Sequence, residues 1–151
     1  MPTAINSDII DISSQDKTQK FANKILKEIN IGDVIFLYGE MGVGKTTFVK
    51  YLINELQKKN KLKLTDVTSP TFNLLNEYQI NQIKVNHYDL FRLKSPDELK
   101  NLDLFVDSSK IITVIEWPQI IKDKPRKLIE LNFKYENNYK KRSVQIRGLD
   151  L

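Results

Sequence analysis

The sequence contains no cysteine and only one histidine, His87. The absence of cysteine excludes disulfides, thiolate nucleophiles and cysteine-ligated zinc, and one histidine cannot form a multi-histidine metal site. Long apolar runs are also missing. The longest, Val34–Tyr38 and Ile111–Ile115, have the length of strands and are far too short to cross a bilayer. Residues 1–8 show neither the basic start nor the apolar core of a secretory signal. We therefore expect a cytoplasmic protein without membrane contact.

The chain has 151 residues, which is enough for one domain, and we expect that domain to span residues 1–151. A formal net charge of +5 permits contact with nucleic acid or with an acidic protein but establishes neither. The basic residues cluster only at 58–63 and 140–142, and we interpret both clusters as solvated turns. Any contact with nucleic acid is therefore expected to be weak.

Strand and helix patterns alternate along the chain. Ser13 is the predicted N-cap of a first helix, because Asp16 stands three residues later as in a capping box. The run Ile111–Ile115, apolar except for Thr113, is typical of a strand buried in a parallel sheet, whereas 72–90 and 127–147 each predict an antiparallel hairpin. The predicted strands are 9–12, 34–38, a strand beginning after Pro70 and ending near 78, 83–90, 111–115, 127–135 and 143–147.

A glycine-rich turn connects the strand 34–38 to a second helix. Residues 39–46 match the phosphate-binding pattern G-x-x-x-x-G-K-[ST]. Glycines allow successive backbone N–H groups to turn toward an anion, and the following helix points its positive end at the same place. Lys45 can reach the β- and γ-phosphates, and Thr46 can hold Mg²⁺. The residues expected to contact the nucleotide are Gly39, Glu40, Met41, Gly42, Val43, Gly44, Lys45, Thr46 and Thr47.

This order of strand, loop and helix predicts an α/β fold, namely a P-loop NTPase-like three-layer fold with a mostly parallel central sheet and antiparallel hairpin additions. Ligands of such sheets bind outside the carboxyl ends of the strands. Asp89 and Glu116 stand at two of these ends, so we expect a carboxylate to serve Mg²⁺ and another group to position the attacking water. The sequence leaves open which acid lies closer to the metal. His87 shares a strand face with Asp89 and could therefore touch the site, but a structural histidine is the default interpretation.

The segment 68–71 contains three hydroxyl groups around a proline that keeps it out of regular structure. A γ-phosphate and its Mg²⁺ can order such a segment, as in nucleotide switches, which makes Ser69 and Thr71 candidate site residues. A plain turn that leads into the next strand has nearly equal support. Trp117 directly follows Glu116, and three roles stay open for it: a lid over the site, a partner contact or core packing.

Four ordered motifs in this chain resemble the TsaE (YjeE) family, which is the small ATPase required for threonylcarbamoyladenosine (t6A) in bacterial tRNAs. The motifs are the loop 39–47, Ser69–Phe72, His87–Leu93 and Ile115–Pro118. The resemblance spans about Ser13–Pro118, and four motifs in one order are much more specific than the phosphate loop alone. Mild departures from the family pattern leave the chemistry of the loop intact; they are Glu40, Met41, Phe91 and Gln119.

The resemblance implies an ATPase that requires ATP and Mg²⁺ and acts on a complex of TsaB and TsaD. By the same resemblance, Lys45 and the loop amides bind ATP. Thr46 serves Mg²⁺ together with Asp89 or Glu116. Catalysis is then expected to involve Lys45, Asp89, Glu116, Thr71 and Trp117.

A small phosphate-loop kinase is the first alternative, because the loop suits it equally well. Such kinases usually supply several arginines to the transferred phosphoryl group, and this chain has no arginine cluster between its motifs. A GTPase has less support, since neither an Asn-Lys-x-Asp motif nor an Asp-x-x-Gly motif follows the loop. A third alternative is a binding module in which ATP only sets the affinity for a partner. Its residues would be the same, so the sequence separates it poorly from a hydrolase.

Overall fold

The computed structural model describes residues 9–70 and 72–151, which form a seven-stranded sheet in the order β1-β7-β6-β2-β5-β4-β3. The strands are β1 (Ile9–Asp11), β2 (Val34–Tyr38), β3 (Leu75–Ile80), β4 (Ile83–Asp89), β5 (Ile111–Glu116), β6 (Ile129–Glu136) and β7 (Lys141–Arg147). The α-helices are α1 (Gln15–Glu28) and α2 (Lys45–Lys59), and the 3₁₀ helices are η1 (Pro96–Asn101), η2 (Ser108–Lys110) and η3 (Pro118–Ile120).

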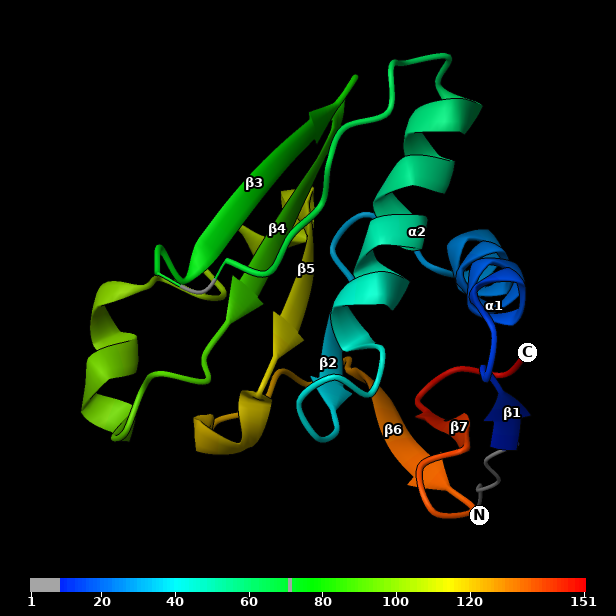
Figure 1. The fold of residues 1–151 in the computed structure, drawn as a ribbon. Coiled ribbons are helices and arrows are strands. Elements are labelled where there is room, and N and C mark those ends of the chain that lie inside the picture. The colour runs from blue at the N-terminus through cyan, green and yellow to red at the C-terminus, as the bar shows by residue number, and fades with distance from the viewer. Residues whose placement is uncertain (1–8, 71) are drawn as a thin grey trace.

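The four central strands β6, β2, β5 and β4 run parallel, whereas β3, β7 and β1 extend the sheet with antiparallel pairs (Figure 1). This confirms the predicted mostly parallel sheet with antiparallel hairpins. Because β2, β5 and β4 are parallel neighbours, their carboxyl ends lie along one edge. Glu116 is in register with Leu37 of β2 and with Asp89 of β4. The two predicted acids are therefore cross-strand neighbours beside the end of the strand that leads into the loop.

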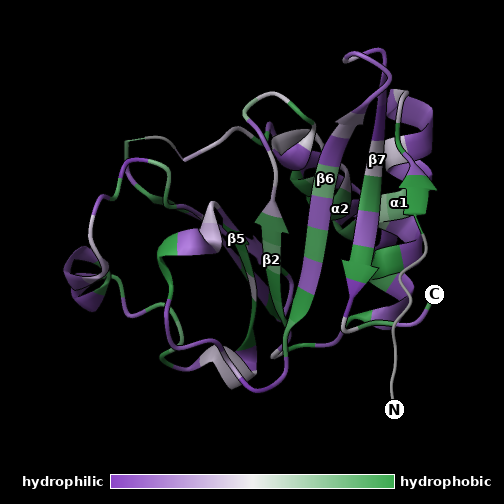
Figure 2. Cartoon of the chain, turned by 90° about the horizontal axis from the view of Figure 1, so that it is seen from below, coloured by the Kyte–Doolittle hydropathy of each residue, from purple (hydrophilic) through white to green (hydrophobic). Residues whose placement is uncertain are grey.

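The two faces of the sheet are covered by different kinds of structure. Ile35 and Leu37 of β2 point to the face that α1 and α2 cover, and Val34 and Phe36 point to the opposite face. The second face is covered by η1, η3 and their connecting segments, so the predicted third layer consists of 3₁₀ helices and loops. Figure 2 shows apolar and polar residues alternating along β6 and β7, which agrees with one buried and one solvated face. Within the described residues, the structure has no helix that is long and apolar enough to cross a membrane.

The start of α1 corrects one prediction. The N-cap is Ser14, whose hydroxyl oxygen accepts a hydrogen bond from the backbone N–H of Lys17 at 3.2 Å. Ser13, the predicted cap, instead donates to the Asp11 carboxylate and accepts from the backbone N–H of Arg142 at 2.9 Å. Its hydroxyl thus joins the beginning of the helix to β7, a contact between residues 129 positions apart that local sequence cannot indicate.

The last hairpin also differs slightly from the prediction. Strand β6 continues to Glu136 and β7 begins at Lys141, so the connecting turn covers residues 137–140 and not 136–138. Three consecutive residues of this turn, Asn137, Asn138 and Tyr139, have positive φ. The alternation of apolar and polar residues that defined the strands is lost at their exposed ends, which explains why the predicted strand bounds differ from the observed ones.

Candidate nucleotide-binding site

The loop between β2 and α2 has a backbone that demands glycine at its first position. A Cβ atom on Gly39 would lie 2.8 Å from both the carbonyl oxygen of Phe133 and Cγ1 of Val43, and its φ is +147°. Gly44, also with positive φ, is the N-cap residue of α2. The helix consequently begins at Lys45, so the N–H groups of its first turn point toward the loop. The side chain of Val43 is fully buried and packs into the core, which anchors the loop.

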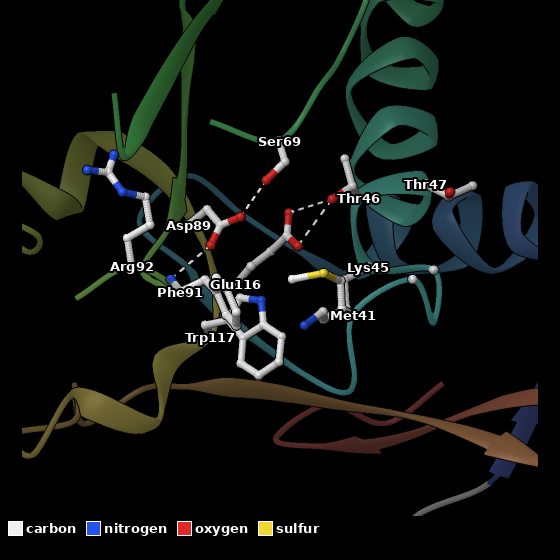
Figure 3. Close-up of a pocket in the computed structure, with 12 residues that line it drawn as sticks. Met41, Lys45, Thr46, Thr47, Ser69, Asp89, Phe91, Arg92, Glu116 and Trp117 are labelled. Atoms are coloured by element: carbon white, nitrogen blue, oxygen red, sulfur yellow. Dashed lines mark hydrogen bonds between the residues drawn. The ribbon is translucent and has the colours of Figure 1, made fainter. Parts of the chain in front are cut away.

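The loop borders a pocket of about 290 Å³ at the carboxyl edge of the sheet (Figure 3). Its lining residues are Met41, Gly42, Gly44, Lys45, Thr46, Thr47, Ser69, Asp89, Phe91, Arg92, Glu116 and Trp117. Most of the predicted site residues are thus brought together around one cavity. Gly39, Glu40 and Val43 belong to the loop without lining the pocket. Thr71 lies outside the described residues.

Glu116 is held between two side chains. The Thr46 hydroxyl lies 3.0 Å from Oε2 and 3.2 Å from Oε1 of Glu116, and Nε2 of His87 lies 2.7 Å from Oε2. Glu116 is 2% exposed and His87 is fully buried. Nδ1 of His87 has no hydrogen-bond partner among the described residues, so we assign the proton to Nε2, which then donates to the carboxylate. The histidine therefore fixes the orientation of Glu116.

Asp89 connects the sheet to the segment around Ser69. One carboxylate oxygen accepts the backbone N–H of Phe91 at 3.0 Å, and the other accepts a short hydrogen bond from the Ser69 hydroxyl. Figure 3 shows Asp89 and Glu116 pointing into the pocket. Asp89 is bonded to Ser69, and Glu116 is bonded to Thr46. A ligand that displaces Ser69 from Asp89 would thereby change the position of the loop before β3.

Lys45 is 3% exposed and is covered by Trp117. Its Nζ lies 3.6 Å from the centroid of the Trp117 ring and 2.5 Å from the carbonyl oxygen of Gly39. Burial lowers the pKa of this ammonium group, while the charges of Glu116 and Asp89 act in the opposite direction. Trp117 has left-handed backbone angles, φ 57° and ψ 54°, and its ring lies 4.9 Å from that of Phe91. Of the three roles left open for Trp117, this geometry favours a lid over the site.

Sequence reasoning assigned no role in the pocket to two of its features. His87 was assigned a structural role by default, whereas its imidazole contacts Glu116 directly. Phe91 and Arg92 line the pocket, although only the family resemblance drew attention to them. The signal for His87 was present in the alternation that places it and Asp89 on one face of β4. The signal that was missing is the pairing of β4 with β5, which brings residue 116 beside this face.

The oxygen donors of the pocket suit Mg²⁺. Thr46, Asp89 and Glu116 offer a hydroxyl and two carboxylates, the hard ligands that this ion prefers. Within residues 9–70 and 72–151, no group of three His, Cys, Asp or Glu side chains is arranged to hold a metal ion. Such a sparse donor set fits an ion that takes most of its ligands from nucleotide phosphates and water.

The sheet order, the glycine loop between β2 and α2, and the acids at the adjacent strand ends define a P-loop NTPase-like α/β protein. Within this class, the sequence model of the threonylcarbamoyl adenosine biosynthesis protein TsaE matches residues 12–144. The chain belongs to the TsaE family.

Individual relatives agree with this family membership. The tRNA threonylcarbamoyladenosine biosynthesis protein TsaE of Rickettsia bellii (strain RML369-C) is 39% identical over 131 residues, which cover 86% of this chain and 88% of that protein. The protein of the same name from Aquifex aeolicus (strain VF5) is 38% identical over 136 residues, covering 89% and 92%. The crystal structure of Bacillus subtilus YdiB superposes with a TM-score of 0.71 at 20% identity, covering 99% of this chain and 90% of that one, and supports the fold.

Proposed function

We propose that this chain binds ATP with Mg²⁺ and hydrolyses it in the cytoplasm as part of the machinery that makes t6A in tRNA, acting on a complex of TsaB and TsaD. Family membership supports the pathway. The observation that supports the reaction is the convergence of Lys45 and Thr46 on two buried acids at one strand edge. Contact with tRNA would be indirect or weak, through the partners.

The geometry supports distinct roles for the two acids. The Thr46 hydroxyl bonds Glu116, so these two side chains would hold Mg²⁺ between them and the phosphates. Bound Mg²⁺ would neutralise charge on the β- and γ-phosphates. Asp89 lies one strand farther from the loop and is connected to Ser69, which suits the positioning of water. The water oxygen would bond to the γ-phosphorus as the bond to the bridging oxygen breaks, with Asp89 accepting the water proton.

A kinase has less support from the pocket than a hydrolase. Among the residues that line the pocket in the described part of the chain, Arg92 is the single arginine. Its guanidinium donates to the carbonyl oxygen of Phe72 at 3.0 Å. Phosphoryl transfer to a metabolite normally requires several cations around the moving group, so we retain the kinase only as an outcome of the following test.

The contact between Lys45 and Trp117 leads to a prediction about partners. Because Nζ of Lys45 bonds the carbonyl oxygen of Gly39 and stacks on Trp117, the isolated chain holds its main phosphate-binding cation within the protein. We therefore expect slow turnover alone and at least about tenfold faster phosphate release when TsaB and TsaD are added. Release of inorganic phosphate from ATP and Mg²⁺ measures both rates.

The same assay distinguishes the alternatives. Phosphate that appears on a small metabolite instead of in solution would favour the kinase. Unchanged slow turnover, combined with an ATP-dependent affinity for the partners, would favour the binding module. Absence of ATP binding in direct titrations would reject the hydrolase, the kinase and the binding module alike.

The contact between His87 and Glu116 gives a second prediction. Replacing His87 with leucine should lower kcat about 10- to 100-fold, since residues that orient a metal-linked carboxylate typically contribute this much. ATP affinity should change little, because His87 contacts Glu116 and is not among the described residues that line the pocket. Glutamine at this position keeps a side-chain N–H donor and should restore part of the rate.

Steady-state kinetics and ATP titrations of His87→Leu and His87→Gln would separate positioning from packing. Thermal unfolding is needed alongside, because His87 is completely buried. Equal losses of kcat in both variants would show that the hydrogen bond to Glu116 does not matter.

A further inference from the structure

Two side-chain amides near the end of α2 hold the segment 62–70, which lies in no helix or strand. Nε2 of Gln57 donates to the Thr65 hydroxyl at 3.0 Å, and Oε1 of Gln57 accepts the backbone N–H of Thr65 at 3.2 Å. Nδ2 of Asn54 donates to the carbonyl oxygen of Thr65 and to Oε1 of Gln57, both at 3.0 Å. We name these contacts among Asn54, Gln57 and Thr65 the Thr65 clamp.

The clamp engages more polar groups than an exposed turn requires. Thr65 is exposed, yet its backbone N–H, its carbonyl group and its hydroxyl group all bond to side chains of α2. The backbone N–H can only donate, which fixes the orientation of the Gln57 amide. Gln57 is 5% exposed, so its amide would be left unpaired in the protein interior if Thr65 moved away. The free-energy cost of an unpaired buried amide therefore keeps Thr65 against the helix.

The clamp lies a short distance along the chain from the acidic side of the pocket. Ser69, whose hydroxyl donates to Asp89, follows Thr65 by four positions. Four residues of fully extended chain span at most about 14 Å. Within this stretch the carbonyl oxygen of Thr68 also accepts a hydrogen bond from Nδ2 of Asn76, at 3.1 Å. The stretch is thus short and held at both ends, so the position of Thr65 helps to set the position of the Ser69 hydroxyl.

The clamp joins this segment to the helix that carries the phosphate-binding residues. The hydrogen bonds at Thr68 and Ser69 lead to β3 and β4, whereas those at Thr65 lead to α2. Helix α2 has Lys45 and Thr46 in its first turn, where both line the pocket. Figure 1 shows the segment after α2 running back from the far end of the helix toward the carboxyl end of β4. The clamp therefore relates the position of Ser69 to that of the helix.

We propose that Gln57, together with Asn54, is a positioning residue for hydrolysis. It fixes Thr65 to α2, and the short stretch that follows then holds the Ser69 hydroxyl against Asp89. Asp89 is the acid to which we assign the positioning of water, so this inference rests on the proposed function. Gln57 acts through Ser69 and Asp89 and does not itself contact the nucleotide.

Replacing Gln57 with leucine should lower kcat about tenfold, within the roughly 100-fold that misplacing a group far from the chemistry can cost. ATP affinity should stay the same, because no residue of the clamp is among the described residues that line the pocket. Phosphate release and calorimetric ATP titration measure the two quantities. Gln19→Leu is the matched control, since the amide of Gln19 also joins two elements, donating from α1 to Glu55 of α2 at 2.5 Å. It should lose a hydrogen bond of the same kind and keep its kcat.

A double-mutant cycle separates positioning from stability. Ser69→Ala removes the hydroxyl that the clamp is proposed to position, so Gln57→Leu in that background should lower kcat no further. The losses in unfolding temperature should still add. Independent losses of kcat in the double variant would show that Gln57 does not act through Ser69, and would overturn the inference.

Thr65 provides a second pair of variants that does not disturb a buried residue. Thr65→Val removes the hydroxyl that accepts from Gln57 and should lower kcat, whereas Thr65→Ser keeps that hydroxyl and should retain the rate. This pair decides the matter if Gln57→Leu fails to fold.

The remaining outcomes concern the inference and the proposed function separately. Unchanged kcat in Gln57→Leu and Thr65→Val, while the unaltered chain hydrolyses ATP, would reject the positioning role and leave the proposed function intact. An equal loss of kcat in Gln19→Leu would show that any weakened contact of α2 has this effect. If the unaltered chain hydrolyses no ATP even with its partners, the proposed function fails and the positioning role fails with it.

Discussion

Replacing Lys45 with alanine should reduce ATP hydrolysis by at least about 100-fold, the typical cost of removing one charged or hydrogen-bonding group that stabilises the transition state. Lys45 is the first residue of α2 and the only lysine that lines the described pocket. Two acids, Glu116 and Asp89, favour its charged form despite burial. Neutralising this position would remove one of the cations that offset the developing charge on the γ-phosphate beside two carboxylates.

The loss should appear in both ATP affinity and kcat, because Lys45 would contact phosphate in the ground state and in the transition state. Phosphate release and ATP titration measure the two quantities. Lys50→Ala is a suitable control, since Lys50 is exposed on the same helix and extends toward the ring of Tyr51, away from the pocket. Sustained multiple-turnover hydrolysis by Lys45→Ala would contradict the assignment of this pocket.

The sequence predicts the elements around the loop because their signals are local. The glycine pattern of 39–46 requires particular backbone angles, and the mostly apolar runs ending near Tyr38 and Glu116 suit strands covered on both faces. The structure confirms the parallel strands, and with them the common edge at which Asp89 and Glu116 meet. Asp89 and Glu116 could be predicted as site residues from the sequence because a strand end in a parallel sheet has a known place relative to the loop.

Contacts that depend on strand order and side-chain rotamers could not be predicted from the sequence. The approach of His87 to Glu116 requires β4 to lie next to β5, although 29 positions separate the two residues. The stacking of Lys45 on Trp117 depends on a left-handed backbone at a bulky residue, which no propensity favours. Such strained positions tend to occur where function, and not local preference, selects the conformation.

The second large effect is expected from Glu116. Replacing it with glutamine should lower kcat about 100- to 1,000-fold while ATP still binds, because the negative charge proposed to serve Mg²⁺ is lost but the loop is unchanged. Glutamine has nearly the same size, and its carbonyl oxygen can still accept the hydrogen bond from Thr46 or His87. The fold should therefore persist, and thermal unfolding would verify this.

Retained ATP binding combined with lost turnover would distinguish the role of Glu116 from that of Lys45. An interaction that is made mainly in the transition state lowers kcat without raising the dissociation constant of ATP, whereas loss of a phosphate-binding cation changes both. Glu77→Gln is a matched control, since Glu77 is exposed on β3 and pairs with Lys84 far from the loop. If Glu116→Gln hydrolyses ATP at the original rate over many turnovers, the Mg²⁺-linked acid must be Asp89, and the bond between Thr46 and Glu116 would be structural.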